Sequence, residues 1–145
     1  MRIDGCMRHP VLTVKPHDSV QRARGIMEER RLNQLPVVID DRLVGIVTDR
    51  DVRDAFPSVF DHTPRRRSRV GVADPGTIAV EDVMSPNVLT LGPDGSVEEA
   101  ARLMRRERIG AIPIVIGERL VGIITRSDVL DAFLALAGES ARAAI

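Results

Sequence analysis

The sequence contains the same stretch twice without a gap. Residues 11–56 read VLTVKPHDSVQRARGIMEERRLNQLPVVIDDRLVGIVTDRDVRDAF, and residues 88–133 read VLTLGPDGSVEEAARLMRRERIGAIPIVIGERLVGIITRSDVLDAF. Thr48 aligns with Thr125, 77 residues later, and the same register aligns Met7 with Met84. This period is longer than the roughly 20–50 residues of solenoid repeats, so it indicates a tandem pair rather than an array. We therefore expect two copies of one folded unit related by a pseudo-twofold axis, with any site in one copy echoed in the other.

The composition is that of a compact protein with a core of aliphatic side chains. A chain of 145 residues with 43% hydrophobic residues suits one domain, or two half-size units that share a core. Only 2% of the residues are aromatic, so a planar ligand would meet aliphatic walls rather than stacked rings. Basic and acidic residues balance at 21 each, which argues against a general polyanion binder.

The sequence favours a cytoplasmic protein without membrane contact. The single cysteine, Cys6, excludes an internal disulfide framework and fits a reducing compartment. The first ten residues lack the apolar segment of a signal peptide, and no apolar run approaches the length of a membrane span.

Each repeat predicts the element order β-α-β-β-α, an α+β fold within the α/β class. A short β-rich run comes first, at residues 11–14 in the first copy, and a helix follows. Asp18 with Gln21, and Ser96 with Glu99, resemble capping boxes at the start of that helix. Two strands then flank a turn at residues 40–42 or 117–119, and a second helix starts at Thr48 or Thr125.

These patterns divide the chain into two repeats with a linker and a tail. Repeat 1 covers residues 1–56 and repeat 2 covers residues 80–137. Residues 57–79 form a linker rich in proline, glycine and charge, and residues 138–145 form a C-terminal tail. We expect the last helix to continue to Gly138 and to fray after it.

The element order and one motif together resemble a known family. Gly45-Ile-Val-Thr48-Asp-Arg-Asp51 and Gly122-Ile-Ile-Thr125-Arg-Ser-Asp128 share the pattern Gly-x-x-Thr-x-x-Asp. With the duplication and the leading stretches that end in Met7 and Met84, the chain resembles a pair of CBS (cystathionine β-synthase) domains, also called a Bateman module. The resemblance covers nearly the whole chain outside residues 57–80 and the tail.

The motif contains residue types that suit a nucleotide. A glycine late in a strand lets a ligand approach the backbone, and a threonine at a helix N-terminus lies where free N–H groups favour phosphate. Asp51 and Asp128 are acceptors that suit the two hydroxyls of a ribose, and the resemblance implies this role. It also implies that the base enters an apolar cleft near the first strand and the start of the second. The candidate ligand residues of repeat 2 are Thr90, Ile112, Pro113, Ile114, Gly122, Thr125, Arg126, Ser127 and Asp128. Those of repeat 1 are Thr13, Lys15, Leu35, Pro36, Val37, Gly45, Thr48, Arg50 and Asp51.

The same motif has a purely structural interpretation. Threonine as N-cap and aspartate three residues later form a capping box that needs no ligand. If ligands do bind, repeat 2 is the preferred site, because Arg126 and Ser127 offer a cation and a hydroxyl near the expected phosphate. Repeat 1 has the acidic Asp49 in place of Arg126, partly offset by Arg50.

Other chemistry has little support in the sequence. The three histidines and Cys6 do not have metal-ligand spacing, and no histidine recurs beside a candidate nucleophile, so we expect neither a metal site nor catalysis. The linker cluster Arg65-Arg66-Arg67 with Arg69 suggests a solvated basic loop. It could instead cover a bound phosphate or contact nucleic acid, although no aromatic stacking residues accompany it.

The sequence therefore predicts a stand-alone regulatory module that senses an adenosine nucleotide (AMP, ADP, ATP or a relative) and signals to an unidentified effector protein. No cofactor is required. The resemblance implies a homodimer formed through helical faces. The alternatives are a ligand-free dimerisation or docking scaffold and, less favoured, a nucleic-acid binder that uses residues 65–69.

Overall fold

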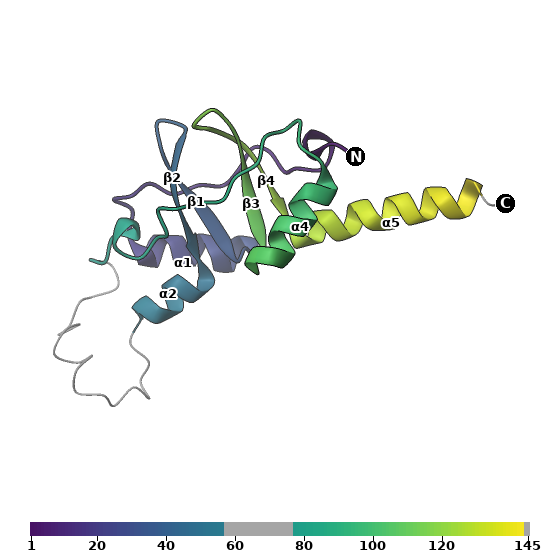
Figure 1. Cartoon of the computed structure of the whole chain (residues 1–145). Helices are drawn as coiled ribbons and strands as arrows, with labels where there is room; N and C mark the ends of the chain where they lie inside the picture. The colour runs from purple at the N-terminus through teal and green to yellow at the C-terminus, as the bar shows by residue number, and fades with distance from the viewer. Residues whose placement is uncertain (57–76, 144–145) are drawn as a thin grey trace. The chain divides into compact units, whose positions relative to one another are not determined.

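The structure divides into two compact units, each containing the helices and strands of one sequence repeat. The computed structural model describes residues 1–56 and 77–143 of the chain (Figure 1). One unit consists of residues 12–88, and the other joins residues 1–11 to residues 89–145. The two units have the same order of elements, which confirms the predicted α+β fold with a tandem repeat.

The unit built on repeat 1 is a helix, a β-hairpin and a second helix. Its elements are α1 (Val20–Arg30), β1 (Gln34–Ile39), β2 (Arg42–Thr48) and α2 (Asp49–Ala55), with the 3₁₀ turn η2 (Val80–Asp82) added from the next repeat. Helices α1 and α2 contact each other and the hairpin (Figure 1).

The unit built on repeat 2 repeats this order. Its elements are α4 (Val97–Glu107), β3 (Ala111–Ile116), β4 (Arg119–Thr125) and α5 (Arg126–Ala143), with the 3₁₀ turn η1 (Ile3–Gly5) contributed by the N-terminus. Helix α5 continues past Gly138, where we expected it to end. An added Cβ at Gly138 would meet nothing within 4 Å, so the glycine there marks neither a turn nor a close contact.

The first strand of each predicted unit is reduced to a single bridging residue. Val14 donates its N–H to Pro36 O over 3.1 Å and accepts from Val38 N over 3.0 Å. In the other unit Leu91 donates to Pro113 O over 3.3 Å and accepts from Val115 N over 2.9 Å. Each residue thus adds a parallel bridge to the edge of its hairpin.

The first helix of each unit starts at a serine. Ser19 accepts a hydrogen bond from Arg22 N over 3.0 Å, and Ser96 accepts one from Glu99 N over 3.1 Å. Asp18, which we predicted as a cap, instead accepts from Lys15 N one turn earlier, over 2.8 Å. The prediction for repeat 1 was therefore wrong by one residue, because a serine and an aspartate are both good caps and stand side by side in the sequence.

The hairpin turns lie where the sequence predicted them. Asp40 and Asp41 both have positive φ, at 49° and 67°, as a type I′ turn requires. In the other hairpin only Gly117 has positive φ, at 63°, which is typical of a type II′ turn. Both hairpins shift register at the same place, one residue before Gly45 and one before Gly122.

The leading segment of each repeat (residues 1–11 and 77–88) packs into the unit of the other repeat. Arg8 exchanges two backbone hydrogen bonds with Ile123 in β4, at 2.8 and 3.1 Å. Ser85 does the same with Ile46 in β2, at 3.0 and 2.9 Å. Ile3 and Val80, both fully buried, belong to the hydrophobic cores of these units. The compact units therefore differ in composition from the sequence repeats, although the repeats themselves are the duplicated segments.

The motif glycines make room for methionines of these leading segments. A Cβ built on Gly45 would lie 3.1 Å from Met84 Cγ, and one built on Gly122 would lie 3.0 Å from Met7 Cγ, with the sulfur atoms closer still. We expected these glycines to let a ligand approach. In the structure a protein side chain occupies that space, so the glycines are required for packing.

We predict that Gly45→Ala and Gly122→Ala each lower the free energy of unfolding by about 1–3 kcal/mol, because the new methyl group overpacks against a methionine. Urea unfolding measures this loss. Gly25→Ala is the control: Gly25 lies within α1 with nothing within 4 Å, so alanine there should be neutral or stabilising. A Met7→Ala/Gly122→Ala double variant should lose less than the two single losses added together, and simple additivity would contradict the contact.

Candidate functional site

Both Thr-x-x-Asp motifs lie where the last strand of a hairpin turns directly into a helix. Thr125 ends β4 and pairs with Ala111, and the next residue donates its backbone N–H to Gly110 O over 3.1 Å. Thr48 ends β2 in the same way, and Asp49 donates to Asn33 O over 2.8 Å. The strand turns abruptly into the helix, so the first N–H groups of the helix have no acceptor within it. The side chains of the motif threonine and aspartate accept hydrogen bonds at this junction instead.

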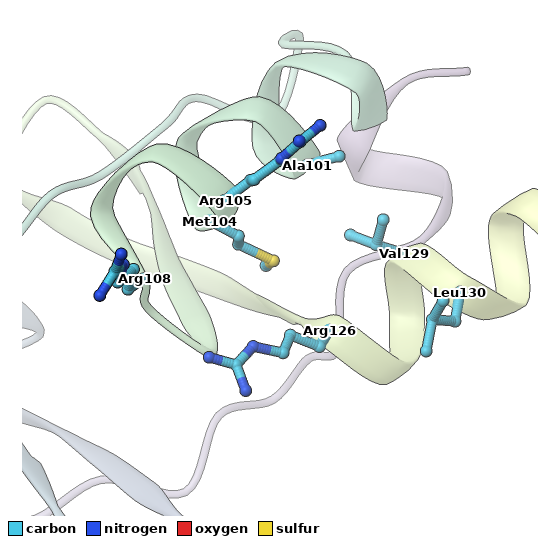
Figure 2. Close-up of a pocket in the computed structure, with 7 residues that line it drawn as sticks. All are labelled: Ala101, Met104, Arg105, Arg108, Arg126, Val129 and Leu130. Carbon is cyan, nitrogen blue, oxygen red and sulfur yellow. The ribbon is translucent and has the colours of Figure 1, made fainter.

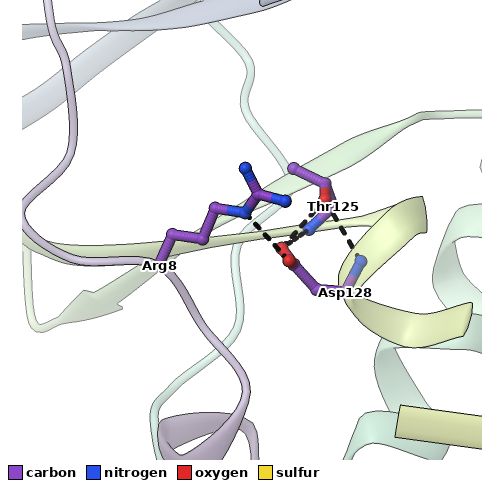
Figure 3. Close-up of polar contacts among 3 residues, drawn as sticks. All are labelled: Arg8, Thr125 and Asp128. Carbon is purple, nitrogen blue, oxygen red and sulfur yellow. Dashed lines mark hydrogen bonds and ion pairs between the residues drawn. The ribbon is translucent and has the colours of Figure 1, made fainter. Parts of the chain in front are cut away.

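In repeat 2 the motif forms a tight cluster around one carboxylate oxygen (Figure 3). Asp128 Oδ2 accepts from Thr125 N and from Thr125 Oγ1, both over 2.8 Å. Thr125 Oγ1 in turn accepts from Asp128 N over 3.4 Å. The side chain of Asp128 is only 8% exposed.

In repeat 1 the same capping box is present in a simpler form. Asp51 Oδ2 accepts from Thr48 N over 2.9 Å, and Thr48 Oγ1 accepts from Asp51 N over 3.2 Å. The structural interpretation of the motif is thus satisfied in both repeats. A capping box uses one oxygen of the aspartate, so it does not by itself exclude a ligand on the other oxygen.

In repeat 2 an arginine from the N-terminal segment holds that other oxygen. Arg8 Nε donates to Asp128 Oδ1 over 2.9 Å, and Figure 3 shows the guanidinium reaching the carboxylate from the leading segment. The Arg8 side chain is 57% exposed. Its backbone is fixed by the bridge to Ile123, which places it beside the motif.

Sequence reasoning did not identify Arg8 as a functional residue. Its counterpart in the duplicated register is Ser85, which is fixed by the same bridge on β2. Among the residues that the structure describes, no arginine or lysine forms an ion pair with Asp51. The Met7–Met84 register was the one available signal, because it equates Arg8 with Ser85 and so marks a difference between the repeats.

The residues expected to form the apolar wall of a base pocket belong to the two cores. Leu35, Val37, Ile112 and Ile114 are fully buried core residues, and Pro36 and Pro113 are as deeply buried. The preceding candidates are more accessible, since Thr13 and Thr90 are half-buried and Lys15 is exposed. The structure brings Thr13 and Thr90 next to these prolines through the bridges at Val14 and Leu91.

The candidates for phosphate contact lie on the surface. Ser127 and Arg50 are exposed. Arg126 lines an open cavity of about 410 Å³ between α4 and α5, together with Arg105 and Arg108 over an apolar floor that includes Met104 and Val129 (Figure 2). Thr125 and Asp128 are not among the residues that line this cavity.

Asp49, which we expected to repel phosphate in repeat 1, is held by its own helix. Its Oδ1 accepts from Arg50 N over 3.0 Å, and its Oδ2 lies 3.8 Å from Arg53 Nη2. The positive charge of Arg53 partly compensates Asp49, which weakens the argument that repeat 1 is the poorer site.

The arginine cluster, a metal site and a membrane span remain to be considered. The arginine cluster at residues 65–69 lies outside the described residues. Within residues 1–56 and 77–143, no three metal-binding side chains gather in one place, and no helix is long and apolar enough to span a bilayer.

A two-unit fold whose strand-to-helix junctions carry Gly-x-x-Thr-x-x-Asp is the architecture of a CBS domain pair. The model of the CBS domain matches this chain twice, at residues 3–58 and 80–135, and the chain belongs to the CBS domain family.

Similar proteins include both short and long chains. The CBS domain-containing protein YhcV of Bacillus subtilis is 32% identical over 139 residues, which cover 96% of this chain and 89% of that protein. An inosine-5′-monophosphate dehydrogenase of Korarchaeum cryptofilum is 35% identical over 130 residues. This match covers 88% of the chain but only 23% of the dehydrogenase.

Solved structures of similar chains contain adenosine compounds. CBSX2 in complex with AMP has a TM-score of 0.78 and 28% identity, and the match covers 94% of this chain and 98% of CBSX2. The CBS domain pair of MJ0100, in complex with 5′-methylthioadenosine and S-adenosyl-L-methionine, has a TM-score of 0.73 and 26% identity. That match covers 92% of this chain and 99% of the pair.

We predict that Asp128→Ala lowers the free energy of unfolding more than Asp51→Ala does. Asp128 is nearly buried and bonds both Thr125 and Arg8, so its loss should cost about 1.5–3 kcal/mol, whereas Asp51→Ala should cost about 1 kcal/mol. Thermal or urea unfolding of the two variants gives the comparison. In a double-mutant cycle, Arg8→Ala and Asp128→Ala should be non-additive, and equal losses for the two aspartates would contradict the added role of Arg8.

Proposed function

We propose that this protein is a regulatory module that binds an adenosine compound at its Thr-x-x-Asp junctions and signals to a partner protein. The observation that carries the proposal is the position of Asp51 and Asp128 in the first turn of a helix that directly follows a strand, where capping bonds hold each aspartate through one oxygen. A capping box needs only one carboxylate oxygen, so the second oxygen can accept from a ribose, which offers two hydroxyl donors; in repeat 2 a ligand would have to displace Arg8 from it.

The bound compounds of similar proteins support this choice of ligand. AMP, 5′-methylthioadenosine and S-adenosyl-L-methionine share the adenosine group but differ in charge. The common element is therefore the base and ribose rather than a phosphate. This agrees with a site in which Arg126 lines another cavity and Ser127 is exposed to solvent.

A regulatory role is favoured over a catalytic one. The motif residues are occupied with capping bonds, and the sequence offers no activated nucleophile or acid–base pair. The match to the dehydrogenase covers less than a quarter of that enzyme, so its activity does not carry over. Signalling would require that the ligand bind one arrangement of the protein more tightly than another, and that a partner recognise that arrangement.

We expect isothermal titration calorimetry to detect binding of at least one compound in a panel of AMP, ADP, ATP, NAD, S-adenosylmethionine and cyclic dinucleotides. The Asp51→Ala/Asp128→Ala double variant should lose this binding, because neither site keeps its ribose acceptor. Asp54→Ala/Asp131→Ala is the matched control. It removes two exposed carboxylates from the same two helices at equivalent repeat positions, and it should bind as the wild type does. If no compound binds the wild type, the ligand-free scaffold is the better description.

We also propose that two chains associate through helix α5. Leu130, Phe133 and Leu134 are 61%, 64% and 64% exposed, and their spacing of three and four residues places them on one face of the helix. The α4–α5 cavity adjoins this face through Leu130. A second copy offers the same face, as a self-complementary twofold interface requires.

Light scattering should therefore give a dimer mass for the wild type and a monomer mass for Leu130→Glu/Leu134→Glu, because each chain would bury two carboxylates against the two of its partner. Leu12→Glu, which changes a 45% exposed leucine outside α5, should leave the mass unchanged. A wild-type protein that remains monomeric at high micromolar concentration would rule out this interface.

A further inference from the structure

The two ribose acceptors are unequal in this structure. Both carboxylate oxygens of Asp128 are engaged, Oδ2 by Thr125 and Oδ1 by Arg8 over 2.9 Å. Asp51 has its capping bond from Thr48 N, and no cation of the described residues holds it. Among the described residues, repeat 1 therefore presents a half-buried carboxylate without an ion pair, where repeat 2 presents an ion pair.

The difference follows from one position in the leading segments. Arg8 and Ser85 have the same backbone bridge, to Ile123 and Ile46 respectively, so each side chain starts from the equivalent place beside its motif. The long guanidinium side chain reaches the aspartate. A serine is too short to neutralise a carboxylate and carries no charge to do so.

We propose that Arg8 closes the ribose acceptor of repeat 2, so that repeat 1 takes up an adenosine compound first. This inference rests on the proposed function and specifies which of its two sites is open. It reverses the order expected from the sequence, which favoured repeat 2 on account of Arg126 and Asp49.

The ion pair between Arg8 and Asp128 weakens ligand binding at repeat 2 but does not prevent it. A ligand at repeat 2 must replace the ion pair with hydrogen bonds from neutral hydroxyls, which are weaker donors to a carboxylate than a guanidinium is. The Arg8 side chain is 57% exposed, so it has solvent available when it leaves the carboxylate. Because the backbone bridge holds the segment in place, truncating the side chain should open the acceptor without releasing the segment.

The test isolates repeat 2 by removing the acceptor of repeat 1. AMP and adenosine are titrated calorimetrically into Asp51→Ala and into Arg8→Ser/Asp51→Ala, which gives repeat 2 the serine of repeat 1. The second variant should bind both compounds about tenfold more tightly, because the ligand no longer has to break the hydrogen bond between Arg8 and Asp128. Adenosine is included because it has no phosphate that a change in net charge could attract or repel.

The converse variant and a charge control complete the design. Ser85→Arg in the Asp128→Ala background should weaken binding at repeat 1 by placing an arginine beside Asp51. Arg2→Ser/Asp51→Ala removes an arginine from the same leading segment, one that pairs with Asp4, and should bind as Asp51→Ala does. Urea unfolding of each variant confirms that the protein remains folded.

The outcomes separate the two proposals. If the wild type binds through Asp51 but Arg8→Ser does not tighten repeat 2, the closure by Arg8 is wrong and the nucleotide function stands. If Arg8→Ser weakens repeat 2, Arg8 is a ligand contact and the inference is again overturned. If neither the wild type nor any Arg8 variant binds adenosine or any compound of the calorimetric panel, both proposals fail.

Discussion

The bridge between each leading segment and the last strand of a hairpin is the contact on which most other features depend. Two backbone hydrogen bonds join Arg8 to Ile123, and two join Ser85 to Ile46. They place Met7 and Met84 against the motif glycines, which must then lack a side chain. They also determine which residue stands beside each Thr-x-x-Asp junction. A contact made for packing thus controls the surroundings of the candidate ligand site.

The capping box explains why this motif supports two interpretations. Thr125 and Asp128 satisfy the free N–H groups of a helix start, and they would do so in a protein that binds nothing. The cap uses only one oxygen of the aspartate and leaves the role of the second oxygen open. The two repeats differ at that oxygen: within residues 1–56 and 77–143, Arg8 pairs with Asp128, and no arginine or lysine pairs with Asp51. Any difference in ligand preference between the repeats would originate there rather than in the caps.

Much of the local structure could be predicted because it depends on neighbouring residues. The duplicated register gave the α+β order, the hairpin turns and the helix that starts at each motif threonine. The error at Asp18 is local as well, since two adjacent residues compete to cap one helix and only packing decides between them. The sequence could not predict that the first strand would shorten to a single bridge at Val14 or Leu91. A β-rich run of four residues indicates an extended chain, but it does not show how many of its residues pair with another strand.

The sequence by itself determined the duplication, the fold class, the family and the motif residues, because each of these is recorded in spacing along the chain. Only the tertiary structure decided which leading segment packs into which unit, and so which side chains meet Gly45, Gly122 and Asp128. Arg8 and Asp128 are 120 residues apart, and periodicity carries no information about contacts at that separation. The repeats look alike in sequence, yet the exchange of leading segments places an arginine beside one aspartate and a serine beside the other.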